Sequence, residues 1–166
     1  MPVTSVTSDP ENLTLTAVGD YAVSVERLWQ AWADPRQLER FWGPPGWPAT
    51  FTRHELRAGG RCLYQMTGPG GEQSCGYWQV ELVEPQVRFV VQNGFATPDG
   101  APNDAMPSMR MEVTFETTPS GSRFTSHTTF PSLEALESLL AMGMREGMTA
   151  ALGQLDDVLA NPAAAR

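Results

Sequence analysis

The sequence contains no lysine, so its 11 cationic side chains are all arginines, set against 19 carboxylates. The formal net charge of −8 repels phosphate backbones and anionic lipid head groups, and we expect neither a nucleic-acid nor a membrane partner. No apolar run approaches the roughly 20 residues needed to cross a bilayer, and the first residues lack the basic and apolar regions of a signal peptide. These absences predict a cytoplasmic protein.

Cysteine and histidine are equally scarce. The two cysteines, Cys62 and Cys75, are too few for a disulfide framework, and the histidines are His54 and His127. A tetrahedral zinc site would need both histidines together with distant ligands. We therefore expect no metal, no cofactor and two free thiols.

Residue arrangements that support catalysis are also missing. The sequence has no G-x-S-x-G motif, and Ser126 and His127 are neighbours on a predicted strand, so their side chains point to opposite faces. The acidic residues of the predicted strands, such as Glu112 and Glu116, fall on the solvent face. The sequence therefore identifies no catalytic residue.

The first third of the chain predicts one strand and two short helices. Residues 1–11 are polar and without periodicity, which predicts a disordered arm, and the alternation over 12–20 is typical of a strand. Ser24 is a favourable helix N-cap, while Asp34 followed by Pro35 ends that helix and begins another. The run GPPGWP then excludes regular structure.

The middle of the chain predicts antiparallel strands joined by glycine-rich turns, over residues 51–57, 61–67 and 73–83. Pairing Cys62 with Trp78 gives one buried face: Cys62, Tyr64, Met66, Trp78, Val80 and Leu82. The same register sends Cys75 to the other face, so the two thiols cannot form a disulfide. Side chains alternate between the two faces of a strand, so if Phe51 faces inward, His54, three residues later, is expected to face outward.

Further alternating segments, at 87–91, 109–116 and 123–130, complete the sheet. The polar insert of residues 95–107 is longer than a turn requires and is typical of a lid or rim. From Ser132 the apolar period becomes helical for about seven turns. Glycines inside this helix, at 143, 147 and 153, each cost about 1 kcal/mol relative to alanine, which indicates close approach of the sheet or room for a ligand. Residues 162–166 follow as a tail.

This order of elements predicts an α+β protein with a single domain over residues 12–161. Consecutive hairpins give a curved antiparallel sheet of about six to seven strands, and the long C-terminal helix must cover its apolar face. Wherever side chains fail to fill the space between the curved sheet and the helix, a cavity remains.

Three segments carry a family pattern, in this order along the chain: RLWQAWADPRQLERFWGPPG, HELRAGGRCLYQMTGPGG and MREGMTAALGQLDDVL. Together they resemble the Hsp90-ATPase-activator-homologue-like family of the START/Bet v 1-like (SRPBCC) superfamily, over roughly residues 13–160. The resemblance implies a helix-grip fold, in which the sheet wraps around the C-terminal helix and two short helices follow the first strand.

The chain departs from the family pattern at the sites that would shape a ligand. Met148 stands where the family pattern has tryptophan, and Glu55 where aspartate is commoner, so the ligands of relatives are not transferred to this chain. The family takes its name from a co-chaperone, but the resemblance implies the fold rather than that partner. We expect no Hsp90-type partner, and the resemblance leaves a homodimer open.

The expected function is binding of a small hydrophobic molecule, aromatic or lipid-like, in a cavity of ~300–1,000 Å³ between the sheet and the C-terminal helix. The expected lining consists of aromatic and methionine side chains: Trp42, Trp47, Tyr64, Met66, Trp78, Phe89, Met109, Met111, Phe115, Met144 and Met148. Tyr64, Arg110 or His127 would orient a polar end of the ligand.

Two alternatives stay open. The first is an enzyme of the cyclase/aromatase or hydrolase type, as in relatives, with polar groups converging in the same cavity. The second is a co-chaperone-like interaction module, with a filled cavity and a contiguous exposed apolar patch.

Overall fold

A computed structural model describes residues 3–161, which form an α+β fold built on one eight-stranded sheet. The strands are β1 (Val3–Asp9), β2 (Thr14–Tyr21), β3 (Ala49–His54), β4 (Arg61–Thr67), β5 (Gln73–Glu84), β6 (Arg88–Ala96), β7 (Met109–Thr118) and β8 (Gly121–Thr129). The helices are α1 (Val25–Ala33), α2 (Pro35–Trp42), α3 (Leu133–Ala141), α4 (Met144–Leu152) and α5 (Leu155–Ala160). The tail expected at 162–166 lies outside the described residues.

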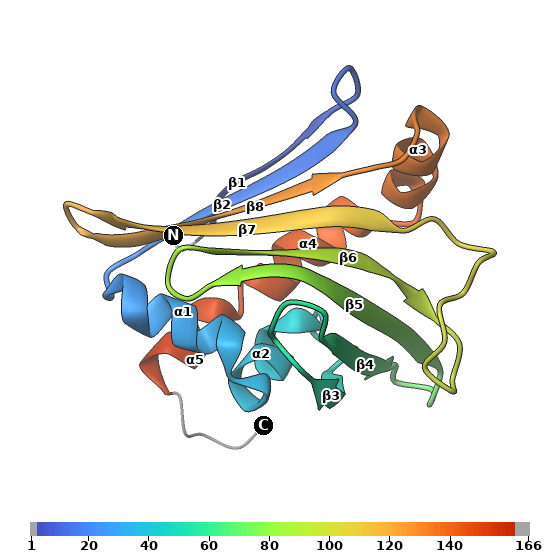
Figure 1. Ribbon diagram of the computed structural model, residues 1–166, viewed down its shortest axis with the longest axis horizontal. Helices are drawn as coiled ribbons and strands as arrows, with labels where there is room; N and C mark the ends of the chain where they lie inside the picture. Colours follow the sequence, from blue (N-terminus) through green and yellow to red (C-terminus); the bar gives the residue numbers. More distant parts are fainter. Residues whose placement is uncertain (1–2, 162–166) are drawn as a thin grey trace.

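The sheet is antiparallel throughout, in the order β1-β2-β8-β7-β6-β5-β4-β3. It curves around α4, and α1, α2 and α5 pack together beside one end of it (Figure 1). The expected helix-grip arrangement is confirmed, with eight strands instead of the six to seven predicted. Among the described residues, no helix has the length and apolar character needed to span a membrane.

The additional strand is β1, in the segment where a disordered arm was expected. Its backbone pairs with β2 from Val3 to Asp9, and the Asp9 carboxylate closes the turn by accepting bonds from the backbone N–H groups of Glu11 (3.1 Å) and Asn12 (3.3 Å). The prediction was wrong because β1 is an edge strand. Of its described side chains Val6 alone enters the core, so the segment has no apolar alternation to recognise.

Both short helices begin where the capping residues predicted. The Ser24 hydroxyl accepts a bond from the backbone N–H of Arg27 at 3.1 Å, and the Asp34 carboxylate accepts one from that of Arg36 at 3.0 Å. Arg27 then joins these helices to the C-terminal end of α5, because its guanidinium donates to the Val158 carbonyl at 2.9 Å. This end of α5 presents free carbonyls and a negative partial charge, which a cation stabilises.

The predicted register of β4 and β5 is confirmed, with Cys62 opposite Trp78 and Tyr64 opposite Gly76. Both cysteines are free, as expected. Leu82 was placed on the wrong face, however. A β-bulge between Val80 and Leu82 inserts one residue, so Val83 takes the inward position and packs against the core.

A second bulge, between Phe51 and Arg53, reverses the prediction for His54. His54 lies opposite Cys62 on the inner face, and its imidazole meets the Phe51 ring edge-on with 5.9 Å between centroids. Burial lowers the pKa of His54, and its Nε2 has no hydrogen-bond partner among the described residues. Predicting the face of a side chain from strict alternation fails at both places, because a bulge adds one residue to the strand and the spacing of apolar residues does not reveal it.

The C-terminal helix is broken into three pieces rather than continuous. Gly143 adopts φ 91°, in the left-handed region that favours glycine, and this residue separates α3 from α4. As a result α3 stands at the end of the sheet, while α4 lies across its concave face (Figure 1). Of the three pieces, α4 is therefore the one that covers the concave face.

Candidate ligand cavity

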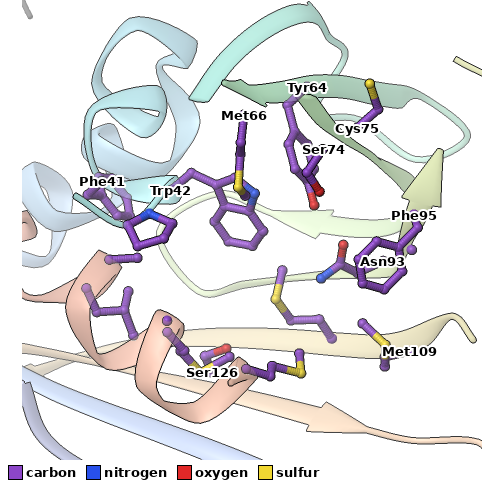
Figure 2. A pocket seen from close by; sticks show the side chains of 18 of the residues that line it. Phe41, Trp42, Tyr64, Met66, Ser74, Cys75, Asn93, Phe95, Met109 and Ser126 are labelled. Atoms are coloured by element: carbon purple, nitrogen blue, oxygen red, sulfur yellow. The ribbon is translucent and has the colours of Figure 1, made fainter. Parts of the chain in front are cut away.

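A cavity of about 240 Å³ lies between the sheet and α4 (Figure 2). It is smaller than the ~300–1,000 Å³ of typical drug-sized sites, but larger than a cavity of about 150 Å³ that binds benzene in another protein. Its lining residues are Trp32, Phe41, Trp42, Pro44, Tyr64, Met66, Ser74, Cys75, Asn93, Gly94, Phe95, Met109, Met111, Ser126, Met144, Gly147, Met148, Ala151 and Leu152. The space suits one or two fused rings.

One face of α4 forms a wall of the cavity. Met144, Gly147, Met148 and Ala151 lie at positions i, i+3, i+4 and i+7, which share one side of a helix. Opposite them, alternate residues of β7 supply Met109 and Met111. Thioether side chains are flexible and polarisable, and they contact aromatic rings favourably, so this part of the wall can adapt to a flat ligand.

The boundary between the cavity and the packed core is aromatic. Trp42 meets Trp78 edge-on at 5.0 Å and Tyr64 at 5.7 Å between ring centroids. The chain beside Trp42 is fixed by the Gln154 side chain, which donates to the Gly43 carbonyl at 2.7 Å. Trp42 is therefore held from α2, from the sheet and from the C-terminal helices at once.

Tyr64 crosses the sheet surface because its cross-strand neighbour is glycine. A Cβ at Gly76 would lie 2.2 Å from Tyr64 Cζ and 2.3 Å from its hydroxyl oxygen, so the phenol ring occupies the place of the missing side chain. Burial raises the pKa of Tyr64 to about 12. At neutral pH the hydroxyl is therefore protonated and can donate a hydrogen bond.

Polar groups in the lining are few and uncharged. They are the hydroxyls of Tyr64, Ser74 and Ser126, the amide of Asn93, the thiol of Cys75 and the indole N–H groups of Trp32 and Trp42, which are buried without a hydrogen-bond partner in the described structure. The described lining contains no Asp, Glu, His, Lys or Arg. No group of three or more His, Cys, Asp or Glu side chains suited to a metal ion occurs within residues 3–161.

The structure brings together a subset of the residues predicted from the sequence. Seven line the cavity: Trp42, Tyr64, Met66, Met109, Met111, Met144 and Met148. Trp78 and Phe89 are fully buried and stacked on each other at 5.5 Å, and Phe115 meets Trp29 edge-on at 5.2 Å. These three belong to the packed core, because α1 and α2 cover their part of the sheet.

Trp47 is also absent from the lining. Its ring lies against Gly68 in the β4–β5 loop, where an added Cβ would come within 2.7 Å of Trp47 Cζ2. The insert predicted at 95–107 begins inside β6, and the chain after β6 folds back on the sheet, with Ala96 bridging Pro102 and Arg61 donating to the Gly100 carbonyl at 3.2 Å. Of the residues 95–107, Phe95 alone is among the described lining.

Of the three polar residues expected to orient a ligand, Tyr64 alone faces the cavity. Arg110 is exposed and lies 3.7 Å from the Glu81 carboxylate. His127 is exposed, with Nδ1 at 3.0 Å from the Thr16 hydroxyl, while its neighbour Ser126 points inward as expected from strand parity.

The sequence reading missed Asn93, Phe95, Ser74 and the lining contributed by Trp32 and Phe41. A signal for Asn93 and Phe95 was present, since they continue the inward parity of Phe89 and Val91. The prediction ended the alternating segment at residue 91 and began the polar insert at residue 95. The structure shows that β6 continues to Ala96.

Substituting Gly147 by alanine is expected to stabilise the protein by about 0.5–1 kcal/mol, because alanine favours the helix and an added Cβ meets nothing within 4 Å. Thermal unfolding should shift upward by about 2–4 °C per kcal/mol in a chain of this size. Gly143→Ala is the matched control: its φ of 91° makes it destabilising by about 1–2 kcal/mol. Equal changes of the unfolding temperature in the same direction for both variants would contradict the placement of the helix break at Gly143.

The chain matches a family model described as Activator of Hsp90 ATPase homolog 1-like protein over residues 22–160. A comparison with curated proteins gives no match. Among solved structures, protein Ms6760 from Mycobacterium smegmatis is 46% identical with a TM-score of 0.87, and the alignment covers 95% of this chain and 97% of that one. A protein from Arthrobacter aurescens is 43% identical with a TM-score of 0.90, over 97% of this chain and 94% of its own.

More distant structures share the fold alone. A protein from Staphylococcus epidermidis is 20% identical, yet it superposes with a TM-score of 0.82 over 98% of both chains. The family model spans nearly all the described helices and strands, and the two bacterial relatives align over almost their whole length. The chain belongs to the family of Activator of Hsp90 ATPase homolog 1-like proteins.

Proposed function

We propose that this protein binds a small, uncharged hydrophobic molecule in the cavity between the sheet and α4, and that it holds this molecule without converting it. The observation that carries the proposal is an apolar cavity of about 240 Å³ whose described lining contains no charged side chain. Burial of ligand surface there supplies affinity at roughly 25 cal/mol per Å².

The lining gives little support to an enzyme. General acid–base catalysis needs a group whose pKa lies near the working pH, usually histidine or a carboxylate. Neither type occurs in the described lining, and burial raises the pKa of Tyr64 to about 12, so its hydroxyl stays protonated at neutral pH and cannot accept a proton as a general base. The described polar side chains can bind and orient a ligand.

An interaction module would require a contiguous exposed apolar patch. The large hydrophobic residues exposed within the described chain are Val87, Leu133 and Met142. Val87 lies in the β5–β6 turn, whereas Leu133 begins α3 and Met142 follows it, at the other end of the sheet (Figure 1). This scattered distribution favours the cavity over the surface as the binding site.

Native mass spectrometry of freshly purified protein tests the proposal directly. We expect a fraction of the protein to carry an additional mass that is lost on denaturation, and small-molecule analysis of the released fraction gives its class. Naphthalene serves as a defined second probe, and we expect it to quench or shift tryptophan fluorescence and to raise the unfolding temperature. A protein that carries no ligand and is unaffected by naphthalene would contradict the proposal.

A further inference from the structure

We propose that Asn93 recognises a single uncharged hydrogen-bonding substituent, a hydroxyl or a carbonyl, on an aromatic ligand. This inference rests on the proposed function and assigns to the cavity a polar end with a defined selectivity. The ligand class is a neutral one- or two-ring aromatic carrying one such substituent, as opposed to a plain hydrocarbon or a carboxylate.

The first observation is the state of the Asn93 side chain. Asn93 is 7% exposed, lies on β6 between the cross-strand neighbours Trp78 and Met109, and lines the cavity. A buried amide has two donors and one acceptor, and leaving them unpaired is costly. Because Asn93 lines the cavity, a molecule bound there can supply partners for this amide.

The second observation is where the amide points. Figure 2 shows the nitrogen and oxygen of Asn93 directed into the cavity, on the side from which the Tyr64 and Ser74 hydroxyls also enter it. The strand register accounts for this grouping. Tyr64 lies across Gly76 towards β6, Gly76 pairs with Phe95, and Asn93 is the next inward residue along that strand.

The other polar groups of the described lining come from separate elements: the Ser126 hydroxyl, the Cys75 thiol and the indole N–H groups of Trp32 and Trp42. Around the rest of the cavity the side chains are aromatic or aliphatic and thioether: Trp42, Met66, Phe95, Met109, Met111, Met144, Met148 and Leu152. The cavity is therefore apolar over most of its surface, and Asn93, Tyr64 and Ser74 form its main group of hydrogen-bonding side chains. A ligand that matches it is an aromatic hydrocarbon body with one polar substituent.

The absence of charged groups from the described lining determines which substituents are accepted. A carboxylate entering this cavity would lose its hydration without meeting a cation, which is far more costly than burying a hydroxyl that is hydrogen-bonded. An amide donates and accepts equally well, so it pairs with either a hydroxyl or a carbonyl. Selectivity for neutral over anionic analogues follows.

Three probes of the same ring size test this selectivity: naphthalene, 2-naphthol and 2-naphthoate, titrated into the wild-type protein at neutral pH. We expect 2-naphthol to bind about tenfold more tightly than naphthalene, and 2-naphthoate to bind at least about a hundredfold more weakly than 2-naphthol. Equal affinity for naphthol and naphthalene, or binding of the naphthoate as tightly as the naphthol, would overturn the inference. Failure of naphthalene itself to bind would instead count against the proposed function.

The substitution Asn93→Leu keeps the size of the side chain and removes the amide. We expect it to abolish the preference for 2-naphthol, an effect of about tenfold, while naphthalene binds at least as well as before. Gln92→Leu is the matched control, since Gln92 is the adjacent amide on β6 and is bonded to Ser108 at 2.8 Å, away from the lining. An unchanged preference in Asn93→Leu would show that the amide does not recognise the substituent.

A measurement on the wild-type protein keeps the inference testable if Asn93→Leu does not fold. The side-chain amide of Asn93 gives its own pair of NMR signals, which can be assigned through backbone and side-chain correlation. We expect these signals to shift with 2-naphthol in a saturable way and to shift much less with naphthalene. Signals that respond equally to both probes, or to neither, would contradict a role in recognition.

Discussion

Replacing Trp32 by alanine is expected to lower the free energy of unfolding by about 3–5 kcal/mol, the usual cost of truncating a buried tryptophan. Trp32 is 1% exposed, and its ring lies 5.1 Å from that of Phe41 and 5.4 Å from that of Phe124. It joins α1 to α2 and to β8. Removing it therefore opens a void where three elements meet, and that void is continuous with the cavity between the sheet and α4, which Trp32 lines.

Urea unfolding at fixed temperature measures the effect, provided that the slope with denaturant is unchanged. Trp32→Phe is expected to cost less than Trp32→Ala, because it keeps a ring and removes an indole N–H that is buried without a hydrogen-bond partner. Trp47→Ala, on a half-buried loop side chain, serves as the control and should cost about 1 kcal/mol or less. A Trp32→Ala effect as small as that of Trp47→Ala would contradict the packing described for α1.

Local signals in the sequence were sufficient for most of the fold. Ser24, Asp34 and Ser132 cap helices where predicted, because a side-chain oxygen near the first free N–H groups acts over only a few residues. Pairing of Cys62 with Trp78 followed from apolar alternation on two adjacent strands. Signals of this kind do not depend on distant parts of the chain, so they can be read without a structure.

The incorrect predictions arise where the regular alternation of a strand or the regular turn of a helix is interrupted and the sequence pattern does not show the interruption. Two bulges add a residue to β3 and β5 and reverse the faces of His54 and Leu82. At Gly143 the apolar stripe continues through the break, so periodicity gave one helix where the backbone forms separate ones. Neither event changes the sequence pattern enough to separate it from regular structure.

Which residues line the cavity depends on tertiary packing, and the apolar periodicity of the sequence carries no information about that packing. Parity correctly places Phe89 and Met111 on the inner face, but Phe89 is covered by Trp29 and Trp32 from α1, whereas Met111 borders open space. Which inward residues remain uncovered is decided by where α1 and α2 rest on the sheet. The sequence therefore predicts the candidates for a cavity, and the three-dimensional arrangement selects among them.

Filling the cavity from α4 should remove ligand binding while the fold is retained. The variant is Gly147→Phe: Gly147 lines the cavity, and an added Cβ there meets no atom within 4 Å, so a larger side chain can extend into the open space. A benzene-sized group fits within about 150 Å³, which is most of the available volume of about 240 Å³. If one ring of naphthalene can no longer enter the cavity, on the order of 100 Å² of its apolar surface stays exposed to water. At roughly 25 cal/mol per Å², this lowers the binding free energy by about 2.5 kcal/mol.

We therefore expect the affinity for naphthalene to fall by about fifty- to a hundredfold in Gly147→Phe, measured by fluorescence titration. Ala150→Phe is the matched control, because Ala150 is exposed on another side of α4 and does not line the cavity. Far-ultraviolet circular dichroism and thermal unfolding of both variants establish that α4 remains folded. Undiminished binding by a folded Gly147→Phe variant would place the ligand elsewhere in the molecule, since the ring added at position 147 and a bound naphthalene cannot share this space.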